Sequence, residues 1–179
     1  MVRVYDLNPV SYIAIGTLGE PGQRVFYLQA GRGRQLVTLI IEKQHALALA
    51  SSLDDLLAEL AARFPRPPAA TPTAPAMGLR EPIEPLFRVG QMGMGYDQGS
   101  DRIVLIAYEL APEEGPAGSV VRFWATREQM KALRNQAIAA LEGGRPECPL
   151  CGELIDPGGH LCPRRNGHGN HPRFVEWAD

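Results

Sequence analysis

The sequence predicts an α+β protein in which two β-β-β-α units share an antiparallel-sheet core over residues 1–144, followed by a small zinc ribbon over 145–179. Two observations favour this class. A succession of three strand-like segments and one helix-like segment occurs twice along the chain, and all three cysteines lie in one short window near its end. The chain has 179 residues, of which 45% are hydrophobic and 21% are charged, and this is enough for a core of ordinary size.

The first predicted unit spans residues 1–64. Three segments rich in β-branched and aromatic residues predict strands, and glycine-rich turns separate them. The strands are expected at 10–15, 24–28 and 36–41. Between Leu49 and Phe64, leucines recur every three or four residues, which predicts a helix with one apolar face. Pro65 ends this helix because proline lacks an amide donor, and a linker rich in proline, alanine and threonine is expected over 65–82.

The second predicted unit spans residues 83–144. Its strands are expected at 87–89, 102–108 and 120–125. The glycine-rich stretch 90–100 is interpreted as a turn. Thr126 and Gln129 predict a capping box, in which each side chain bonds the backbone amide of the other residue, so a helix should begin here. The apolar stripe that follows ends at Gly143.

The two units predict an internal repeat. Gly16–Gly19 is aligned with Gly90–Gly93, and Arg24–Leu28 is aligned with Arg102–Ile106. Few residues are identical between the units, so an ordinary β-β-β-α pattern without duplication stays open as the alternative.

The tail carries the residues with metal chemistry. Cys148 and Cys151 form a Cys-x-x-Cys knuckle, in which two thiolates can bind one zinc ion. The Asp-Pro-Gly-Gly stretch at 156–159 is a turn signal, because proline presets φ and glycine accepts a positive φ. Such a turn would fold the chain back and bring Cys162 to the knuckle.

Two histidines compete for the fourth ligand position. His168 is favoured, because a turn over 163–167 can close a second knuckle, and His160 is the alternative. Either histidine gives a closed set of three cysteines and one histidine, which is typical of structural zinc rather than of catalytic zinc with an open position for water. A cysteine nucleophile paired with His168 is a rival hypothesis, but it leaves the other two cysteines unexplained.

The expected function is that of a non-catalytic, zinc-binding protein-interaction or adaptor module. The formal charge of −2 does not favour a protein that binds nucleic acid through a large overall positive charge. The alternative is a module that binds single-stranded nucleic acid through arginines and aromatic residues of the first hairpins. Its candidate residues are Arg24, Arg32, Arg34, Tyr12, Phe26 and Tyr27. An enzyme is the third hypothesis, although no paired carboxylates, triad or phosphate loop support it.

The expected location is the cytoplasm. No apolar run approaches the roughly 20 residues that cross a bilayer, and the first residues lack the apolar region of a signal peptide. We therefore expect no membrane partner and cysteines that stay reduced.

Two motifs resemble an uncharacterised bacterial domain family of unknown function. The first reads Tyr-Ile-Ala-Ile-Gly-Thr-x-Gly-x-Pro-Gly-x-Arg-x-Phe-Tyr-Leu-Gln-Ala at 12–30. The second combines Cys-Pro-Leu-Cys-Gly at 148–152 with Gly-His-Leu-Cys-Pro-Arg-Arg-Asn-Gly-His at 159–168. The resemblance spans nearly the whole chain and implies a bacterial cytoplasmic protein with a zinc-binding-like tail, but no reaction. The order of elements is also similar in outline to the single-strand-binding folds of the whirly and PUR-alpha types.

Overall fold

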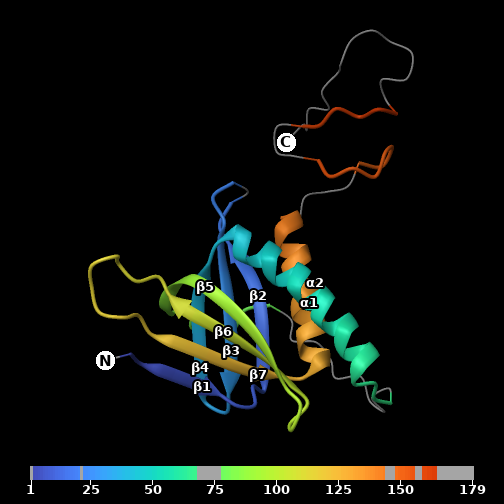
Figure 1. Ribbon diagram of the computed structural model, residues 1–179. Helices are drawn as coiled ribbons and strands as arrows, with labels where there is room; N and C mark the ends of the chain where they lie inside the picture. The colour runs from blue at the N-terminus through green and yellow to red at the C-terminus, as the bar shows by residue number, and fades with distance from the viewer. Residues whose placement is uncertain (1, 21, 68–77, 144–147, 156–158, 165–179) are drawn as a thin grey trace. The chain divides into compact units, whose positions relative to one another are not determined.

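The chain divides into two compact units, Met1–Leu141 and Glu142–Asp179, and each is described by itself. The computed structural model describes residues 2–20, 22–67, 78–143, 148–155 and 159–164. The first unit holds the sheet (Figure 1), and the second holds the cysteines.

Seven strands of the described residues form one sheet in the order β1-β7-β6-β5-β4-β3-β2. Their bounds are Val4–Leu7 (β1), Tyr12–Leu18 (β2), Val25–Arg32 (β3), Gln35–Ile41 (β4), Pro85–Asp97 (β5), Arg102–Glu109 (β6) and Val120–Ala125 (β7). Strands β2 to β4 form one antiparallel meander, and β5 to β7 form another. Strands β4 and β5 pair in parallel, as do β1 and β7.

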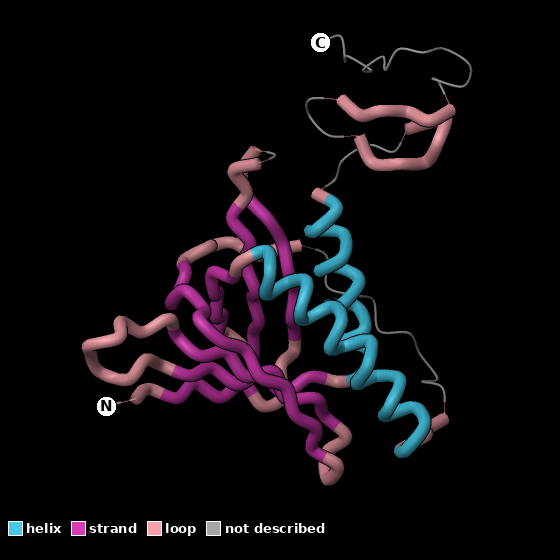
Figure 2. The backbone as a smooth tube through the Cα atoms, turned by 45° about the horizontal axis from the view of Figure 1, so that its top comes forward, coloured by secondary structure: helices cyan, strands magenta, loops and turns pink. Residues whose placement is uncertain are grey.

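Two helices, α1 (Lys43–Arg63) and α2 (Arg127–Glu142), lie side by side over one face of the sheet (Figure 2). Side chains alternate between the two faces along each strand, and Leu28 and Leu105 are buried on the face that the helices cover. Burying this apolar face against the helical stripes is the main source of stability. Among the described residues, neither helix is long and apolar enough to cross a membrane.

The start of α2 confirms the predicted capping box. Thr126 accepts a hydrogen bond from the Gln129 amide at 3.1 Å, and the Gln129 side chain accepts one from the Thr126 amide at 2.9 Å. The start of α1 has a box of the same kind, in which Nδ1 of His45 accepts a hydrogen bond from the Glu42 amide at 3.0 Å. In each case one capping residue separates the end of the preceding strand from the first residue of the helix.

The predicted α+β class is confirmed, but the sheet is not antiparallel throughout. α1 connects β4 to β5 and returns the chain to the end of the sheet where β4 began, so these neighbours run in parallel. The sequence pattern predicts no strand over residues 1–9. β1 has only four residues there, and it is ordered by its parallel pairing with β7.

The prediction of a turn over 90–100 is wrong. β5 continues to Asp97, and the turn that follows occupies only 98–101. Gly90 lies where the β5–β6 register shifts, and a Cβ atom there would come within 3.0 Å of the Cα of Leu110. Gly90 therefore marks a bulge and a close backbone approach within a strand, and glycine is common at both kinds of position.

The two meanders and their helices match in register and burial. The fourth, seventh and eleventh residues are buried in both helices: Ala46, Leu49 and Leu53 in α1, and Met130, Leu133 and Ala137 in α2. The last residue pair of the β2–β3 hairpin is Leu18–Val25, and that of the β5–β6 hairpin is Asp97–Arg102. Leu28 and Leu105 each lie three residues after the second member of that pair, and both are buried. The predicted alignment of Leu28 with Ile106 is therefore shifted by one residue, because the Ile106 side chain lies on the sheet face opposite the helices. Duplication itself stays a prediction.

Part of the sheet face opposite the helices is covered by the end of the predicted linker. A Cβ atom on Gly16 would come within 2.7 Å of the Cγ of Leu79, so the leucine fills the space above this glycine. The guanidinium of Arg80 stacks on the Tyr12 ring, 3.8 Å from its centroid. The Arg80 backbone exchanges hydrogen bonds of 2.7 and 2.9 Å with the buried side chain of Gln29. This part of the linker is therefore packed on β2 and β3.

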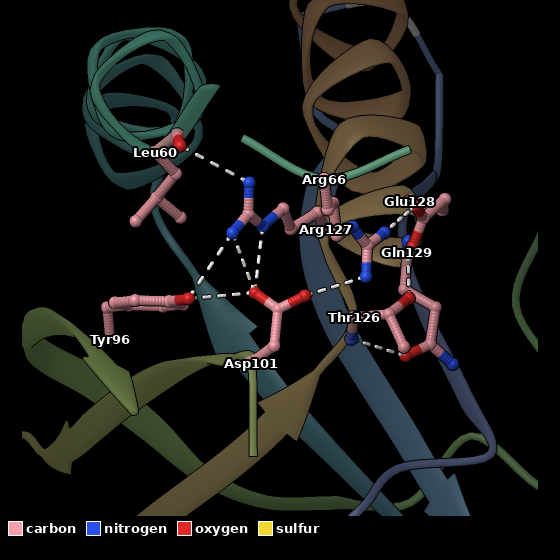
Figure 3. A network of polar contacts seen from close by, with 8 residues as sticks. All are labelled: Leu60, Arg66, Tyr96, Asp101, Thr126, Arg127, Glu128 and Gln129. Carbon is pink, nitrogen blue, oxygen red and sulfur yellow. Dashed lines mark hydrogen bonds and ion pairs between the residues drawn. The ribbon is translucent and has the colours of Figure 1, made fainter. Parts of the chain in front are cut away.

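A polar network joins both helices to the β5–β6 turn (Figure 3). The carboxylate of Asp101 accepts hydrogen bonds from the Tyr96 hydroxyl (2.8 Å), Arg127 (2.9 Å) and Arg66 (2.7 Å). Arg127 also donates to the carbonyl of Leu60 near the end of α1 at 3.3 Å. Burial alone would raise the pKa of Asp101, but the hydrogen bonds from Tyr96 and Arg127 and the charges of both arginines lower it below its usual value.

Replacing Asp101 should therefore destabilise the sheet unit. Asp101 has a φ of +51°, which asparagine also tolerates, so Asp101→Asn removes the charge and leaves the backbone conformation accessible. We expect a loss of about 1.5–3 kcal/mol in the free energy of unfolding, because Arg127 is left largely buried without its counter-ion. Chemical denaturation measures this loss. Glu59→Gln, which removes an exposed pair with Arg63, is the matched control and should cost less than about 0.5 kcal/mol.

The contribution of Asp101 to the free energy of unfolding should depend on pH. A carboxyl whose pKa is lower in the folded protein contributes stability above the pKa of the unfolded chain, about 3.9 for aspartate. That contribution is lost as the pH falls through the folded-state pKa. The difference between wild type and Asp101→Asn should therefore be full at neutral pH and shrink below about pH 4. A difference that is the same at neutral and acidic pH would contradict the ion-pair account.

Candidate metal centre

The first ligand segment is a tight backbone turn. The Cys148 amide donates to the carbonyl of Glu153 at 2.8 Å, and the Gly152 amide donates to the carbonyl of Cys148 at 2.8 Å. Gly152 has a φ of +76°, a conformation that favours glycine. The Cys-Pro-Leu-Cys-Gly sequence therefore folds into a knuckle that directs the sulfurs of Cys148 and Cys151 to the same side.

Four side chains converge at this knuckle. The Sγ atoms of Cys148, Cys151 and Cys162 and a ring nitrogen of His160 all lie within 4.8 Å of one another. The Sγ atoms of Cys148 and Cys162 are 3.8 Å apart, and Nε2 of His160 is 3.3 Å from the Sγ of Cys151. Tetrahedral zinc, with Zn–S of about 2.3 Å and Zn–N of about 2.0–2.1 Å, separates two sulfurs by about 3.8 Å and a sulfur from a nitrogen by about 3.5 Å. The group therefore has the dimensions of a metal site.

The surroundings of the cysteines favour the thiolate form at one position. Burial alone would raise the pKa of Cys148, but hydrogen bonds from the amides of Leu150 and Cys151 and from the neighbouring thiols lower this pKa to about 7. For Cys151, the amide of Glu153 lowers the pKa, but burial and the neighbouring sulfurs outweigh it and raise the pKa above its usual value. Several thiolates cannot crowd together without a cation, which is the reason that such a group suits a metal ion.

His160 presents one ring nitrogen to the cysteines and buries the other. Nε2 faces Cys151, whereas Nδ1 is buried without a hydrogen-bond partner among the described residues. His160 and Cys162 are two positions apart, and alternate side chains in an extended segment point to the same side. This spacing is the sequence signal that could have favoured His160. His168 and the stretch 165–179 lie outside the described residues, so the choice between the two histidines stays a prediction.

The aromatic residues proposed to stack on nucleic-acid bases are poorly accessible. Tyr12 and Phe26 are buried, and the Tyr12 ring is also covered by Arg80. Tyr27 is half-buried on β3. Two of the three aromatic residues are therefore not accessible to a base.

A cleft of about 430 Å³ lies between α1 and α2. Its lining residues are Asp54, Leu57, Ala58, Arg127, Glu128, Lys131 and Arg134. Asp54 pairs with Arg134 at 3.1 Å, and Glu128 pairs with Arg66. Because both carboxylates are ion-paired, they hold the two helices and the chain after α1 together.

A family model described as a protein of unknown function, DUF3090, matches residues 5–162. The chain belongs to the DUF3090 family. The match covers the sheet unit and continues through Cys148, Cys151 and His160 to Cys162, so all four residues of the cluster lie within the family region. No curated protein and no solved structure matches this DUF3090 chain.

Proposed function

We propose that Cys148, Cys151, His160 and Cys162 bind one structural zinc ion, and that this DUF3090 protein is a non-catalytic protein-interaction or adaptor module. The observation that carries the proposal is the convergence of the four ligand atoms within 4.8 Å. Three cysteines and one histidine are a donor set that zinc prefers, and bound zinc would cross-link the two segments that supply them.

A structural role is favoured over a catalytic one by the ligand count. The four side chains complete a tetrahedral shell and leave no position for water or substrate. The sulfurs of Cys148 and Cys162 are also buried, which restricts access to the centre. A cysteine ligand set must stay reduced, so we place the protein in a reducing compartment such as the cytoplasm.

The cluster also replaces an apolar core in its unit. Among the described residues, the buried side chains there are those of Cys148, Ile155 and Cys162. Three such residues bury too little apolar surface to offset the entropy of ordering the chain. Metal binding would supply the missing stabilisation, as in other small zinc units.

Exposed leucines beside the ligands support a protein partner. Leu150, between the two knuckle cysteines, is 47% exposed, and Leu161, between His160 and Cys162, is 55% exposed. A metal ion would hold both leucines in fixed positions on the surface. Fixed apolar side chains suit contact with a protein more than contact with phosphate groups.

The choice of histidine is tested by zinc retention. His160→Ala in the full chain should weaken zinc affinity by more than about 100-fold, beyond the effect of losing an outer-shell partner of a ligand. His168→Ala is the matched control and should leave the affinity unchanged. Competition with a chromogenic chelator measures both. A larger loss for His168→Ala than for His160→Ala would assign the fourth ligand to His168.

We also propose that the two β-β-β-α units are a true repeat. The matching burial of both helices and the matching strand order support it. Their joint core would then arise by pairing β4 of one unit with β5 of the next.

A further inference from the structure

We propose that the face of β2 and β3 opposite the helices is a peptide-binding site, and that residues 78–80 of the same chain occupy it in this structure. These residues read Gly-Leu-Arg and are called the strap below. The partner that fits is a protein with an exposed, extended segment in which leucine is followed by arginine. The site lies on the sheet unit and does not depend on the metal centre, so the proposal goes beyond the function proposed above.

The strap is held through its main chain. The Tyr12 hydroxyl donates a hydrogen bond to the carbonyl of Gly78. The Gln29 side chain accepts a hydrogen bond from the Arg80 amide at 2.7 Å and donates one to the Arg80 carbonyl at 2.9 Å. A side-chain amide that bonds both main-chain groups of one residue imitates the pairing of a neighbouring strand. Any extended segment can make these bonds, and domains that bind extended peptides draw affinity from such contacts.

Two side chains of the strap give the site its selectivity. Leu79 lies over Gly16, where a Cβ atom would come within 2.7 Å of the leucine Cγ, so glycine is what leaves room for the leucine. The guanidinium of Arg80 stacks on the Tyr12 ring, 3.8 Å from its centroid. The space over the glycine accepts an apolar side chain and the ring accepts a cation, which together specify leucine followed by arginine.

The strap can leave without opening the core. Gly78 and Arg80 are exposed, Leu79 is half-buried, and none of the three belongs to the apolar core of the sheet unit. The second meander shows that a sheet of this kind does not need such an occupant. Gly95 lies two residues before the last pair of its hairpin, as Gly16 does, and no described atom is within 4 Å of a Cβ built on it.

The polar groups beneath the strap select another peptide as its replacement. Gln29 is fully buried, and it also donates to Thr38 at 2.9 Å and accepts from Tyr12 at 3.2 Å. Its remaining lone pair and N–H are the two that bond the strap. The main chain of an incoming segment replaces both bonds, whereas an apolar ligand would leave them unmade. The site therefore fits an extended peptide.

The strap competes with any partner because it is tethered to the site. A segment on a short linker has an effective concentration in the millimolar range, of the order of the Kd of a weak peptide contact. A free peptide should therefore bind the wild-type chain weakly, and it should bind better once the side chains that anchor the strap are removed.

Fluorescence anisotropy with a labelled peptide of residues 78–83 (Gly-Leu-Arg-Glu-Pro-Ile) tests the proposal. The host is the full chain carrying Leu79→Asp and Arg80→Ala, called the released variant. It should bind the peptide with a Kd below about 1 mM, at least about tenfold more tightly than wild type, whose strap competes. Peptides that carry Leu79→Ala or Arg80→Ala should bind the released variant at least about tenfold more weakly.

Gly16→Val in the released variant should abolish peptide binding, because the valine fills the space that the leucine needs. Gly95→Val in the same host is the matched control. It adds the same side chain where the equivalent position of β5 is open, and it should bind the peptide like its host. Circular dichroism checks that each variant is folded.

Three results would overturn the proposal. A folded released variant that binds no peptide at about 1 mM would show that the face does not recognise a segment in trans. Binding that Gly16→Val leaves unchanged would show that another surface takes the peptide. A released variant that does not fold would show that the strap is a required part of the sheet unit and not an exchangeable occupant.

Discussion

Removal of zinc is expected to unfold the C-terminal unit while the sheet unit stays folded. In the described part of the C-terminal unit, the buried side chains are those of Cys148, Ile155 and Cys162. Two of these three, Cys148 and Cys162, are proposed zinc ligands. The sheet unit has an apolar core of its own that contains none of the cysteines. Since the ligands must be deprotonated to bind, acid should have the same effect as a chelator.

Hydrogen exchange followed residue by residue separates the two units. After addition of a strong chelator, amides over 148–155 and 159–164 should lose their protection, whereas those of β3 and β6 should keep theirs. Cys151→Ser should reproduce this pattern without a chelator, and Leu150→Ala, which removes an exposed side chain from the same knuckle, should not. Protection of the C-terminal amides that survives chelation would show that metal does not hold this unit together.

The largest loss of stability from one core substitution is expected at Phe123. This β7 side chain is fully buried and is the largest of the fully buried side chains among the described residues. Phe123→Ala removes its apolar surface and leaves a cavity between the sheet and the helices, so we expect a loss of about 3–5 kcal/mol. Domains of this size have total stabilities of about 5–15 kcal/mol, so the variant should be close to unfolding.

Urea denaturation followed by far-ultraviolet circular dichroism measures this loss. Leu47→Ala removes a leucine side chain that is 62% exposed on α1, and it should change the stability by less than about 0.5 kcal/mol. A loss below about 1 kcal/mol for Phe123→Ala would mean that β7 does not pack against the helices as described.

Local sequence signals predicted much of the sheet unit. The alternation of apolar residues gave the bounds of β7 without error, and the Thr126 capping box located the start of α2. Both features depend on residues close together in the chain. β1 could not be found in this way, because four residues with one buried side chain carry little pattern, and its partner is β7 at the other end of the unit.

Glycine was the least informative signal for the fold. In β2, Gly16 admits Leu79 of the distant linker, and in β5, Gly90 lies at a bulge against Leu110. Local propensity treats such glycines as turn residues, because the contact that requires them comes from elsewhere in the chain. At Gly90, the turn interpretation of 90–100 failed for this reason.

The metal cluster was predictable in its cysteines and less so in its histidine. The Cys148–Cys151 spacing implies a knuckle whatever the rest of the chain does. The fourth ligand depends on the path that the chain takes back to that knuckle, which spacing alone does not determine. The structure groups His160 with the cysteines, and this is the basis on which we propose it as the ligand.

The most direct test of the account is the zinc content of the full chain purified without chelators. We expect elemental analysis by mass spectrometry to find one zinc ion per chain, with Cys148, Cys151 and Cys162 unreactive towards a thiol reagent until the metal is removed. Folded protein that contains no stoichiometric zinc and whose three thiols all react freely would contradict the proposed metal centre.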